Sequence, residues 1–323
     1  MTYKIAMSDT IWPDFNIEKS VLKTIGAELI LAADDSPESI VAVAKDADAM
    51  VVVYAEITAD IINRLEKCKV IVRTGIGVNN VNVEAATQKG IYVAYVPDYC
   101  WDEVSDHAIA LAFSLARKTA LLDKTVKSGT WDITVAKPMF RLRGQTFGLV
   151  GLGNIAKVAA QKAKAFGFNV IAMDPFISQE DADPLGVKMV EFDQLLRESD
   201  FISIHCPLVD ATHHLFNEEA FEKMKNTAFL VNTSRGPVVD TKALVAALKS
   251  GQIAGAGLDV LEEAPPDPDD ELLKLDNVIL TPHTGFYSDQ SSDDLRKFSL
   301  QEVVRVLKGE KPKNLFNKEV LNS

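Results

Sequence analysis

Two residues with reactive side chains each follow a short apolar run that is predicted to form a buried strand. Arg235 comes after the run 229–231, and His283 comes after the run 278–280. A guanidinium can hold a carboxylate through two parallel hydrogen bonds, and an imidazole can donate a proton near neutral pH. Ligands of open α/β sheets bind at the carboxyl ends of strands. The two residues therefore fit carboxylate binding and carbonyl protonation, although position alone also allows a turn-capping arginine and a structural histidine.

A glycine-rich turn follows the apolar run 146–150. It reads Gly151-Leu152-Gly153-Asn154-Ile155-Ala156, which fits the Gly-x-Gly-x-x-Gly/Ala pattern with alanine in the third place. The first glycine permits a tight turn, the second lets the backbone approach a pyrophosphate, and the small third residue lets a helix pack on the strand. A helix predicted over 154–166 would point its free N–H groups at the phosphates. The motif predicts a dinucleotide-binding site.

An acidic residue supports this prediction and indicates which dinucleotide is bound. Asp174 follows the apolar run 169–173 and lies 23 residues after Gly151 (174 − 151 = 23), close to the spacing of about 20 that is typical of such sites. A carboxylate there accepts hydrogen bonds from a ribose 2′-hydroxyl and repels a 2′-phosphate. No arginine follows directly, since the next residues are Pro175-Phe176-Ile177. The expected cofactor is NAD rather than NADP, and the alternative is a glycine turn with an incidental aspartate.

The other histidines are weaker candidates for chemistry. His107 lies in a long predicted helix, where we expect a packing role. His205 ends a predicted strand directly before Cys206-Pro207 and would border the cofactor. His213 and His214 lie in a polar turn and are expected to face solvent. No third ligand stands at a suitable spacing for a metal, so we expect no metal site.

The elements that must position these residues alternate between strands and helices. Strands are predicted at 4–7, 28–31, 49–53, 70–72, 92–96, 146–150, 169–173, 201–204, 229–231, 256–260 and 278–280. Helices are predicted at 58–67, 83–88, 101–118, 154–166 and about 291–307, and the stretch 128–144 looks irregular. Strands separated by helices in this way indicate βαβ units and parallel sheets.

Length and composition set limits on the classes of protein. The chain has 323 residues, which is enough for two domains, and a formal net charge of −12. An acidic surface repels nucleic acid and anionic lipid, so neither partner is expected. No apolar run reaches the roughly 18 residues of a membrane span, and the first residues do not resemble a signal peptide. The three cysteines (Cys68, Cys100 and Cys206) are scattered, which predicts free core thiols and a cytoplasmic location.

Taken together, these motifs make the chain similar to the D-isomer-specific 2-hydroxyacid dehydrogenase family, over nearly its whole length. The motifs that carry the resemblance occur in the family's order. They are Arg73-Thr74-Gly75-Ile76-Gly77-Val78-Asn79-Asn80-Val81, Gly151 to Ala156 with Asp174, His205-Cys206-Pro207-Leu208, Asn232 to Pro237, Leu258-Asp259-Val260 and Thr281-Pro282-His283. So many ordered motifs make the resemblance specific.

The resemblance implies an α/β fold of two Rossmann-like lobes with the active site in the cleft between them. A flavodoxin-like substrate lobe would comprise residues 1–100 and 288–323, and an NAD-binding Rossmann lobe would comprise residues 101–287. Family members are usually dimers through the cofactor lobe. The segment 131–143 matches the arm that reaches across to the second subunit, so a homodimer is expected.

The resemblance also implies roles for individual residues. Arg235 resembles the arginine that binds the substrate carboxylate, and His283 resembles the acid/base. The backbone N–H groups of Gly75, Ile76 and Gly77 resemble the loop that also grips the carboxylate. The implied cofactor-binding set is Gly151, Gly153, Asn154, Ile155, Asp174, Cys206, Pro207, Thr233, Ser234, Arg235, Asp259 (near the nicotinamide carboxamide), His283 and Gly285.

One position departs from the family's pattern. Members usually read Asp-Val-x-x-x-Glu-Pro, and that Glu pairs with the catalytic histidine; this chain reads Asp259-Val260-Leu261-Glu262-Glu263-Ala264-Pro265. Ala264 thus occupies the position of the Glu, and a neighbouring carboxylate is expected to project elsewhere. Because an adjacent carboxylate raises the pKa of a histidine, His283 should hold its proton less well. Asn82, where Asp is common, is a lesser departure.

Two main functions follow from these expectations. The first is an NAD-dependent 2-hydroxyacid dehydrogenase, or 2-oxo acid reductase, which works slowly, uses another partner for His283, or regains activity with a glutamate in place of Ala264. The second is a catalytically silent NAD(H)-sensing regulator, as in the family's corepressor branch. A dehydrogenase that needs no acid/base, as formate oxidation allows, is a more distant alternative. The expected pocket walls near 50–53, 99–101 and 286–287 contain aromatic residues, which favours a substrate with a small or apolar group over a phosphate.

Overall fold

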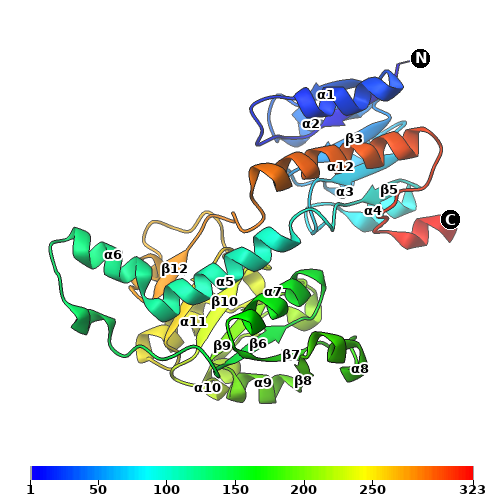
Figure 1. The fold of residues 1–323 in the computed structure, drawn as a ribbon. Helices are drawn as coiled ribbons and strands as arrows, with labels where there is room; N and C mark the ends of the chain where they lie inside the picture. Colours follow the sequence, from blue (N-terminus) through cyan, green and yellow to red (C-terminus); the bar gives the residue numbers. More distant parts are fainter. Residues whose placement is uncertain (1, 323) are drawn as a thin grey trace. The chain divides into compact units, whose positions relative to one another are not determined.

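The computed structural model describes residues 2–322, and these form two compact units. Residues up to Cys100, together with those from Ser288 onward, form the first unit, and Trp101–Tyr287 form the second. Each unit has a parallel sheet with helices on both faces (Figure 1). The predicted fold class, α/β with two Rossmann-like sheets, is confirmed.

The first unit has a five-stranded sheet in the order β2-β1-β3-β4-β5, with all neighbours parallel. Its strands are β1 Lys4–Met7, β2 Glu28–Leu31, β3 Ala49–Val52, β4 Val70–Arg73 and β5 Tyr92–Ala94. Its helices are α1 Asn16–Leu22, α2 Pro37–Ala44, α3 Ala59–Asn63, α4 Val83–Gln88 and α12 Asp289–Leu307, with 3-10 turns at Lys23–Ile25 and Lys318–Asn322. Helices α2, α3 and α4 pack on one face of the sheet, and α1 and α12 pack on the other.

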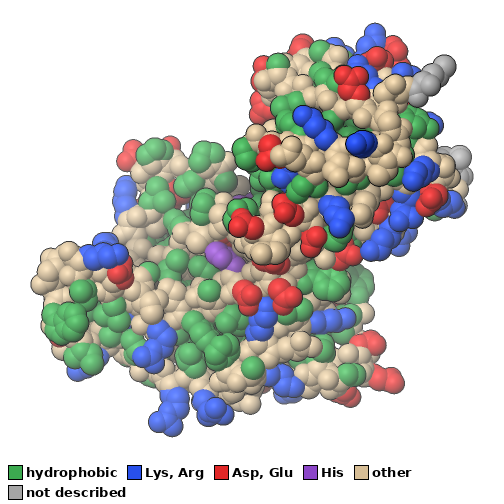
Figure 2. All heavy atoms as spheres, turned by 45° about the horizontal axis from the view of Figure 1, so that its top comes forward, with side chains coloured by type: hydrophobic (Ala, Val, Ile, Leu, Met, Phe, Trp, Pro, Cys, Tyr) green, Lys and Arg blue, Asp and Glu red, His purple; other side chains and the backbone are tan. Residues whose placement is uncertain are grey.

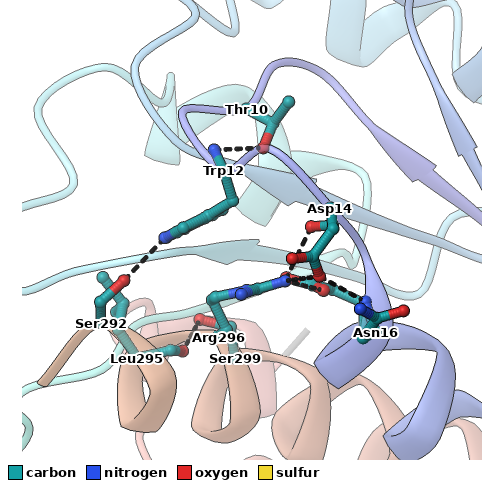
Figure 3. A network of polar contacts seen from close by, with 9 residues as sticks. Thr10, Trp12, Asp14, Asn16, Ser292, Leu295, Arg296 and Ser299 are labelled. Carbon is teal, nitrogen blue, oxygen red and sulfur yellow. Dashed lines mark hydrogen bonds and ion pairs between the residues drawn. The ribbon is translucent and has the colours of Figure 1, made fainter. Parts of the chain in front are cut away.

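A buried polar network fastens α12, the returning C-terminal helix, to the N-terminal part of the first unit (Figure 3). Arg296 is 6% exposed, and its Nε and one terminal nitrogen each lie 2.7 Å from an oxygen of Glu18, which is fully buried. The same terminal nitrogen donates to the carbonyl of Asp14 at 2.7 Å. The Trp12 indole lies 5.5 Å from the guanidinium and donates to Ser292 Oγ at 2.8 Å. Such an ion pair depends on both partners, because a single buried charge would be left uncompensated.

The second unit has a seven-stranded parallel sheet in the order β12-β11-β10-β9-β6-β7-β8. Its strands are β6 Thr146–Val150, β7 Asn169–Met173, β8 Lys188–Met189, β9 Phe201–Ile204, β10 Phe229–Asn232, β11 Gly255–Leu258 and β12 Val278–Leu280. Its helices are α5 Trp101–Arg117, α6 Thr119–Lys127, α7 Asn154–Ala165, α8 Gln179–Ala182, α9 Phe192–Glu198, α10 Glu218–Lys223 and α11 Thr241–Ser250, with 3-10 turns at Ile133–Ala136, Asp183–Leu185, Asp210–Thr212, Gly236–Val238 and Glu271–Lys274. Helices α5 and α7 pack on one face, and α9, α10 and α11 pack on the other. The strand order reverses between β6 and β9, which is where dinucleotides bind in this class of sheet.

Most predicted elements coincide with observed ones, and the differences have local causes. Helix α3 ends at Asn63, whereas the sequence pattern predicts a helix over 58–67. The amide of Glu66 donates to the carbonyl of Lys45 at 2.8 Å, and this bond draws the chain out of the helix toward β4. The two-residue strand β8 has no predicted counterpart, because so short an element has no readable period. None of the helices in residues 2–322 combines the length and the apolar character needed to cross a bilayer.

The end of α6 and the stretch that follows it expose apolar side chains. Val126, Trp131, Ile133 and Phe140 are 46%, 89%, 80% and 50% exposed. In the space-filling view, hydrophobic side chains gather at the left end of the second unit, over α6 and the chain that follows it (Figure 2). Apolar side chains of this size on a surface commonly mark an interaction site.

Candidate active site

The sheet of the second unit brings most of the predicted site residues together at the carboxyl ends of its strands, here called its carboxyl edge. Each lies just beyond the carboxyl end of a parallel strand, and along the sheet they stand in this order: His283 (after β12), Asp259 (after β11), Arg235 (after β10), Cys206 (after β9), Gly151 (after β6) and Asp174 (after β7). The carboxyl edge of a doubly wound sheet is the usual place of a ligand site. Residues more than 130 positions apart in the sequence therefore line one edge of the fold.

The glycine turn has the geometry that its sequence predicts. Gly151 has a φ of +87°, and a Cβ on it would lie 2.9 Å from the backbone nitrogen of Cys206, so a side chain has neither the conformation nor the space. Gly153 caps the N-terminus of α7, and no atom of the described chain comes within 4 Å of the position a Cβ would take there. The turn is thus closed against the protein and open where a phosphate would approach.

Asp174 is built into the same turn. Its Oδ2 accepts the amide of Leu152 at 2.8 Å, and its Oδ1 accepts the amide of Phe176 at 2.9 Å. The amide of Gly151 donates to the carbonyl of Met173 at 2.8 Å, so β7 and the glycine turn are joined beside the carboxylate. An ionised carboxylate can accept about four hydrogen bonds, and capacity remains for a ribose hydroxyl.

The turn that carries Arg235 is closed by Asn232. The buried amide of Asn232 donates to the carbonyl of Arg235 at 2.9 Å, and its oxygen accepts the amide of Ser234 at 3.0 Å. A Cβ on Gly236 would collide with the carbonyl of Leu261, so the loops after β10 and β11 are in close contact. Between these two anchors the guanidinium of Arg235 donates to the carbonyl of Ser234 at 2.7 Å.

Asp259 organises the loop that carries His283. Its carboxylate accepts the hydroxyl of Thr281 at 2.6 Å and the amides of Thr284 and Gly285 at 2.9 and 2.8 Å. Its carbonyl accepts the amide of His283 at 2.9 Å. Burial opposes ionisation of Asp259, but hydrogen bonds from His107, Thr281 and the two amides outweigh burial and lower the pKa of the carboxyl. Asp259 is therefore an anion that binds the loop after β12.

Two histidines have polar contacts that the sequence did not indicate. His107 was expected to pack, but its Nε2 lies 2.9 Å from Thr281 Oγ1 and 3.4 Å from Asp259 Oδ1. His214 was expected to face solvent; its side chain is 34% exposed, but its Nε2 also lies 2.6 Å from Glu262 Oε1. The signal available for His107 was a polar residue within an apolar helix, which does not identify a partner.

The side chains of Glu262 and His205 form hydrogen bonds with residues outside the loop that carries His283. The second oxygen of Glu262 accepts the amide of Thr241 at 3.1 Å, and although burial raises its pKa, His214 and Thr241 lower it overall. His205 Nε2 lies 2.9 Å from Ser203 Oγ, and burial lowers the pKa of His205 to about 4. His205 is therefore a neutral, structural neighbour of the dinucleotide site.

The first unit has a glycine loop of its own at the carboxyl end of β4. Gly75 has a φ of +141°, and a Cβ on it would collide with the guanidinium of Arg73, which lies against this glycine of the loop Gly75-Ile76-Gly77. Within residues 2–322 the buried Nε of Arg73 has no hydrogen-bond partner, and burial lowers the pKa of the guanidinium. Asp9 accepts the amides of Val53 and Tyr54 at 3.0 and 2.6 Å and so orders the neighbouring loop after β3. The sequence indicated Arg73 only as the first residue of the motif 73–81, whereas its buried, unpaired Nε makes it a candidate anion ligand.

Comparison with known proteins identifies the family to which this chain belongs. Residues 109–285, more than half of the chain, match the family model described as "D-isomer specific 2-hydroxyacid dehydrogenase, NAD binding domain". The chain belongs to this family. It carries the family's NAD-binding domain and is an NAD-dependent oxidoreductase of the class that acts on the CH–OH group of 2-hydroxy acids.

Individual relatives cover nearly the whole chain. Glyoxylate reductase of Korarchaeum cryptofilum is 40% identical over 301 residues, which are 91% of this chain and 91% of that protein. D-3-phosphoglycerate dehydrogenase of Methanocaldococcus jannaschii is 39% identical over 316 residues, 97% of this chain but 59% of that longer protein. The structure of D-lactate dehydrogenase from Aquifex aeolicus, complexed with NAD and lactic acid, superposes with a TM-score of 0.87 at 29% identity and covers 97% of this chain and 98% of that chain.

The residues present fit the cofactor. The open position at Gly153 leaves room for a pyrophosphate at the N-terminus of α7. Within the described chain, the buried Oγ1 of Thr233, at the carboxyl end of β10, has no hydrogen-bond partner, which is costly unless a ligand supplies one. Bound NAD(H) would supply the hydride, and the protein would supply binding, orientation and the proton.

Proposed function

We propose that the chain reduces a small 2-oxo acid with NADH, and that Arg235 and His283 are the residues that act on the substrate. The observation that carries the proposal is the edge formed by β10, β11 and β12. There Arg235 follows β10 and the His283 loop follows β12, on one side of the glycine turn, and Asp259 follows β11, the strand between them. A cation, a proton donor and a dinucleotide site on one edge suit a carbonyl reduction.

Each residue has one task in this proposal. The guanidinium of Arg235 binds the substrate carboxylate, and the family resemblance gives the same task to the N–H groups of Gly75, Ile76 and Gly77. His283 donates a proton to the carbonyl oxygen as the carbon is reduced, and in the reverse direction it takes the proton back. The cofactor is held by the residues implied above, from Gly151 to Gly285. The second unit is thus the NAD-binding domain, and the first is the substrate-binding domain.

The side chain of the substrate is proposed to be small and uncharged. The loop after β3 offers Tyr54 and the exposed carboxylate of Glu56, and a carboxylate disfavours a phosphate. Tyr99, whose pKa is raised well above its ordinary value by burial, offers a neutral surface on the same unit. Among the activities named for relatives, these residues favour glyoxylate reduction over phosphoglycerate oxidation.

We also propose that Ala264 replaces the glutamate that pairs with the acid/base histidine in the family. The carboxylate of Glu262, two residues earlier, is held by His214 and Thr241, which argues against its taking that place. Without the glutamate His283 would hold its proton less well. Turnover should then be slow and should fall further as the pH rises.

The test compares four proteins in NADH oxidation with glyoxylate, hydroxypyruvate, pyruvate and 2-oxobutyrate. These are the native chain, Ala264→Glu, the uncharged control Ala264→Gln, and His283→Asn. We expect slow native turnover, faster turnover with Glu but not with Gln, and none with Asn. Undiminished turnover of His283→Asn would refute the acid/base assignment.

A second candidate is an NAD(H)-sensing regulator without turnover, and Ala264 is the observation that favours it. Ligand-dependent closure would then alter a surface that another protein reads. Tight NADH binding with no turnover in the native chain or in Ala264→Glu would favour this function over the reductase.

We further propose a cytoplasmic homodimer in which the arm 131–143 contributes to the interface. The exposed Trp131, Ile133 and Phe140 support this, as does an open cavity of about 390 Å³ lined partly by Pro138 and Phe140 of the arm. The three free cysteines fit a reducing compartment. Light scattering should give twice the chain mass, and Trp131→Asp should shift it toward the monomer. A native monomer at micromolar concentration would refute the dimer, and an extracellular fraction would refute the location.

A further inference from the structure

His283 has an unusual backbone conformation. Its φ is +53°, in the left-handed region that residues with a Cβ seldom adopt. Such a conformation persists where the surrounding contacts impose it, and it is often found at functional sites. The contacts that impose it here therefore bear on how the imidazole is presented.

Those contacts converge on Asp259. Three consecutive amides donate to this one residue: His283 to its carbonyl at 2.9 Å, and Thr284 and Gly285 to its carboxylate oxygens at 2.9 and 2.8 Å. A Cβ on Gly285 would lie 2.8 Å from Asp259 Oδ2, so a glycine is needed for the approach. The backbone of the loop is thus fixed by one residue, which holds His283 through its main-chain carbonyl and the two following amides through its carboxylate.

The protons around this carboxylate can be assigned. Asp259 is 3% exposed and ionised, so it only accepts hydrogen bonds. The one proton of the Thr281 hydroxyl goes to Asp259 Oδ1 at 2.6 Å. The contact of 2.9 Å between Thr281 Oγ1 and His107 Nε2 must then be donated by the histidine. His107 therefore carries a proton on Nε2, and that N–H also lies 3.4 Å from Asp259 Oδ1.

His107 is anchored independently of the loop. It lies in the middle of α5, whose buried residues Ala108, Leu111 and Ala112 belong to the core beneath the sheet. Helix α5 packs against β10, β11 and α7. The N–H of His107 is therefore delivered from a rigid element, whereas Thr281 and Asp259 belong to the edge where the chemistry is proposed.

We propose that His107 is a positioning residue for His283, acting through Thr281 and Asp259. This inference rests on the proposed function, in which His283 is the acid/base. The N–H of His107 fixes the Thr281 hydroxyl, the hydroxyl and the ring edge fix the carboxylate of Asp259, and the carboxylate fixes the amides of the loop. Because Arg235 holds the substrate carboxylate separately, loss of this chain should slow proton transfer more than it weakens substrate binding.

The experiment compares His107→Leu, which removes the N–H, with His107→Gln, which keeps an N–H donor at nearly the same reach. His213→Leu, at an exposed histidine, is the matched control. We expect His107→Leu to lower kcat about tenfold, the scale of one hydrogen bond, with the KM for the 2-oxo acid changed less than about twofold. His107→Gln should restore most of kcat, and His213→Leu should match the native chain. Equal kcat in His107→Leu and the native chain, or equal loss in the Leu and Gln variants, would overturn the proposal.

A second measurement works without turnover. Amide hydrogen exchange over residues 281–287 should be faster in His107→Leu than in the native chain and near native in His107→Gln, with the core strands unchanged. Unchanged exchange in His107→Leu would overturn the inference even in a silent protein. If His283→Asn abolishes turnover and His107→Leu does not lower it, the inference alone fails. If His283→Asn retains turnover, the proposed function fails and the positioning role fails with it.

Discussion

Replacing Asp259 with asparagine changes the charge that organises the His283 loop and almost nothing else. The two side chains have the same shape, so packing of this buried residue is retained. Oδ1 of Asp259 accepts hydrogen bonds from the Thr281 hydroxyl and the Thr284 amide, with His107 Nε2 at 3.4 Å, and Oδ2 accepts the amide of Gly285. Asparagine has one oxygen and one NH₂ group. If the oxygen takes the place of Oδ1, the NH₂ faces the amide of Gly285, and two donors oppose each other.

The cost can be estimated from this geometry. A hydrogen bond to a charged group contributes about 1.5–3 kcal/mol. One such bond is lost in the better orientation of the amide, so the native loop should be less populated by a factor of about 10 to 150. If only the native loop presents His283 to substrate, kcat should fall by up to that factor. The KM for the 2-oxo acid should change little, because Arg235 lies in a turn closed by Asn232.

The assay is steady-state NADH oxidation by Asp259→Asn and by Asp276→Asn, a surface control whose carboxylate pairs with Lys124. The pKa of Asp259 is lowered from 3.8 in the folded protein, so its stabilisation is complete above that value and is lost only as the pH falls through the lower, folded pKa. The loss in Asp259→Asn relative to the native chain should therefore be constant between about pH 5 and pH 8. A native kcat in Asp259→Asn, or a loss that disappears within that range, would refute the reasoning.

Three further predictions concern the cofactor turn, a buried histidine and the helix clamp. Gly151→Ala places a Cβ 2.9 Å from the backbone of Cys206 at a φ of +87°, so fluorescence titration should give an NADH Kd at least about tenfold higher; an unchanged Kd would contradict the turn's role. His205 takes up a proton near pH 6.5 in the unfolded chain but only near pH 4 in the folded protein. The free energy of unfolding in urea should therefore decrease by about 1.4 kcal/mol for each unit by which the pH falls from 6.5 to 4, and His205→Gln should remove this slope. Glu18→Ala leaves Arg296 with the half-exposed Asp14, at 3.3 Å, as its remaining ion-pair partner and should cost about 3 kcal/mol, the lower end of the range for a broken buried pair. Joint replacement (Glu18→Leu with Arg296→Met) should recover most of the loss, and equal losses would argue against a buried pair.

The residues that could be predicted from the sequence share one property: each lies within a few residues of the end of an apolar run. The carboxyl ends of parallel strands lie on the same side of a sheet, so the sequence places Gly151, Asp174, Arg235 and His283 where ligands bind in such a sheet. The bounds of β1, β6, β7 and other strands also coincide with their runs, because a buried parallel strand is a continuous apolar segment with polar flanks. Local sequence therefore determined both the elements and the side of the sheet on which the chemistry lies.

The other contacts of the site join side chains that lie far apart in the sequence, and no local sequence pattern indicates that they meet. His107 reaches Asp259 from a helix more than 150 residues earlier, and nothing in an amphipathic pattern says that a histidine on its buried side will meet a carboxylate. His214 and Glu262 likewise belong to loops whose approach depends on the missing side chain of Gly236. In these cases the packing of the sheet and helices determines which side chains meet. Around Asp259, the ionised carboxylate can only accept hydrogen bonds, and this identifies Thr281 and His107 as donors. Ala264 illustrates the same point. The motif shows that the family's glutamate is missing at this position, but only the contacts of Glu262 with His214 and Thr241 argue that Glu262 does not take its place.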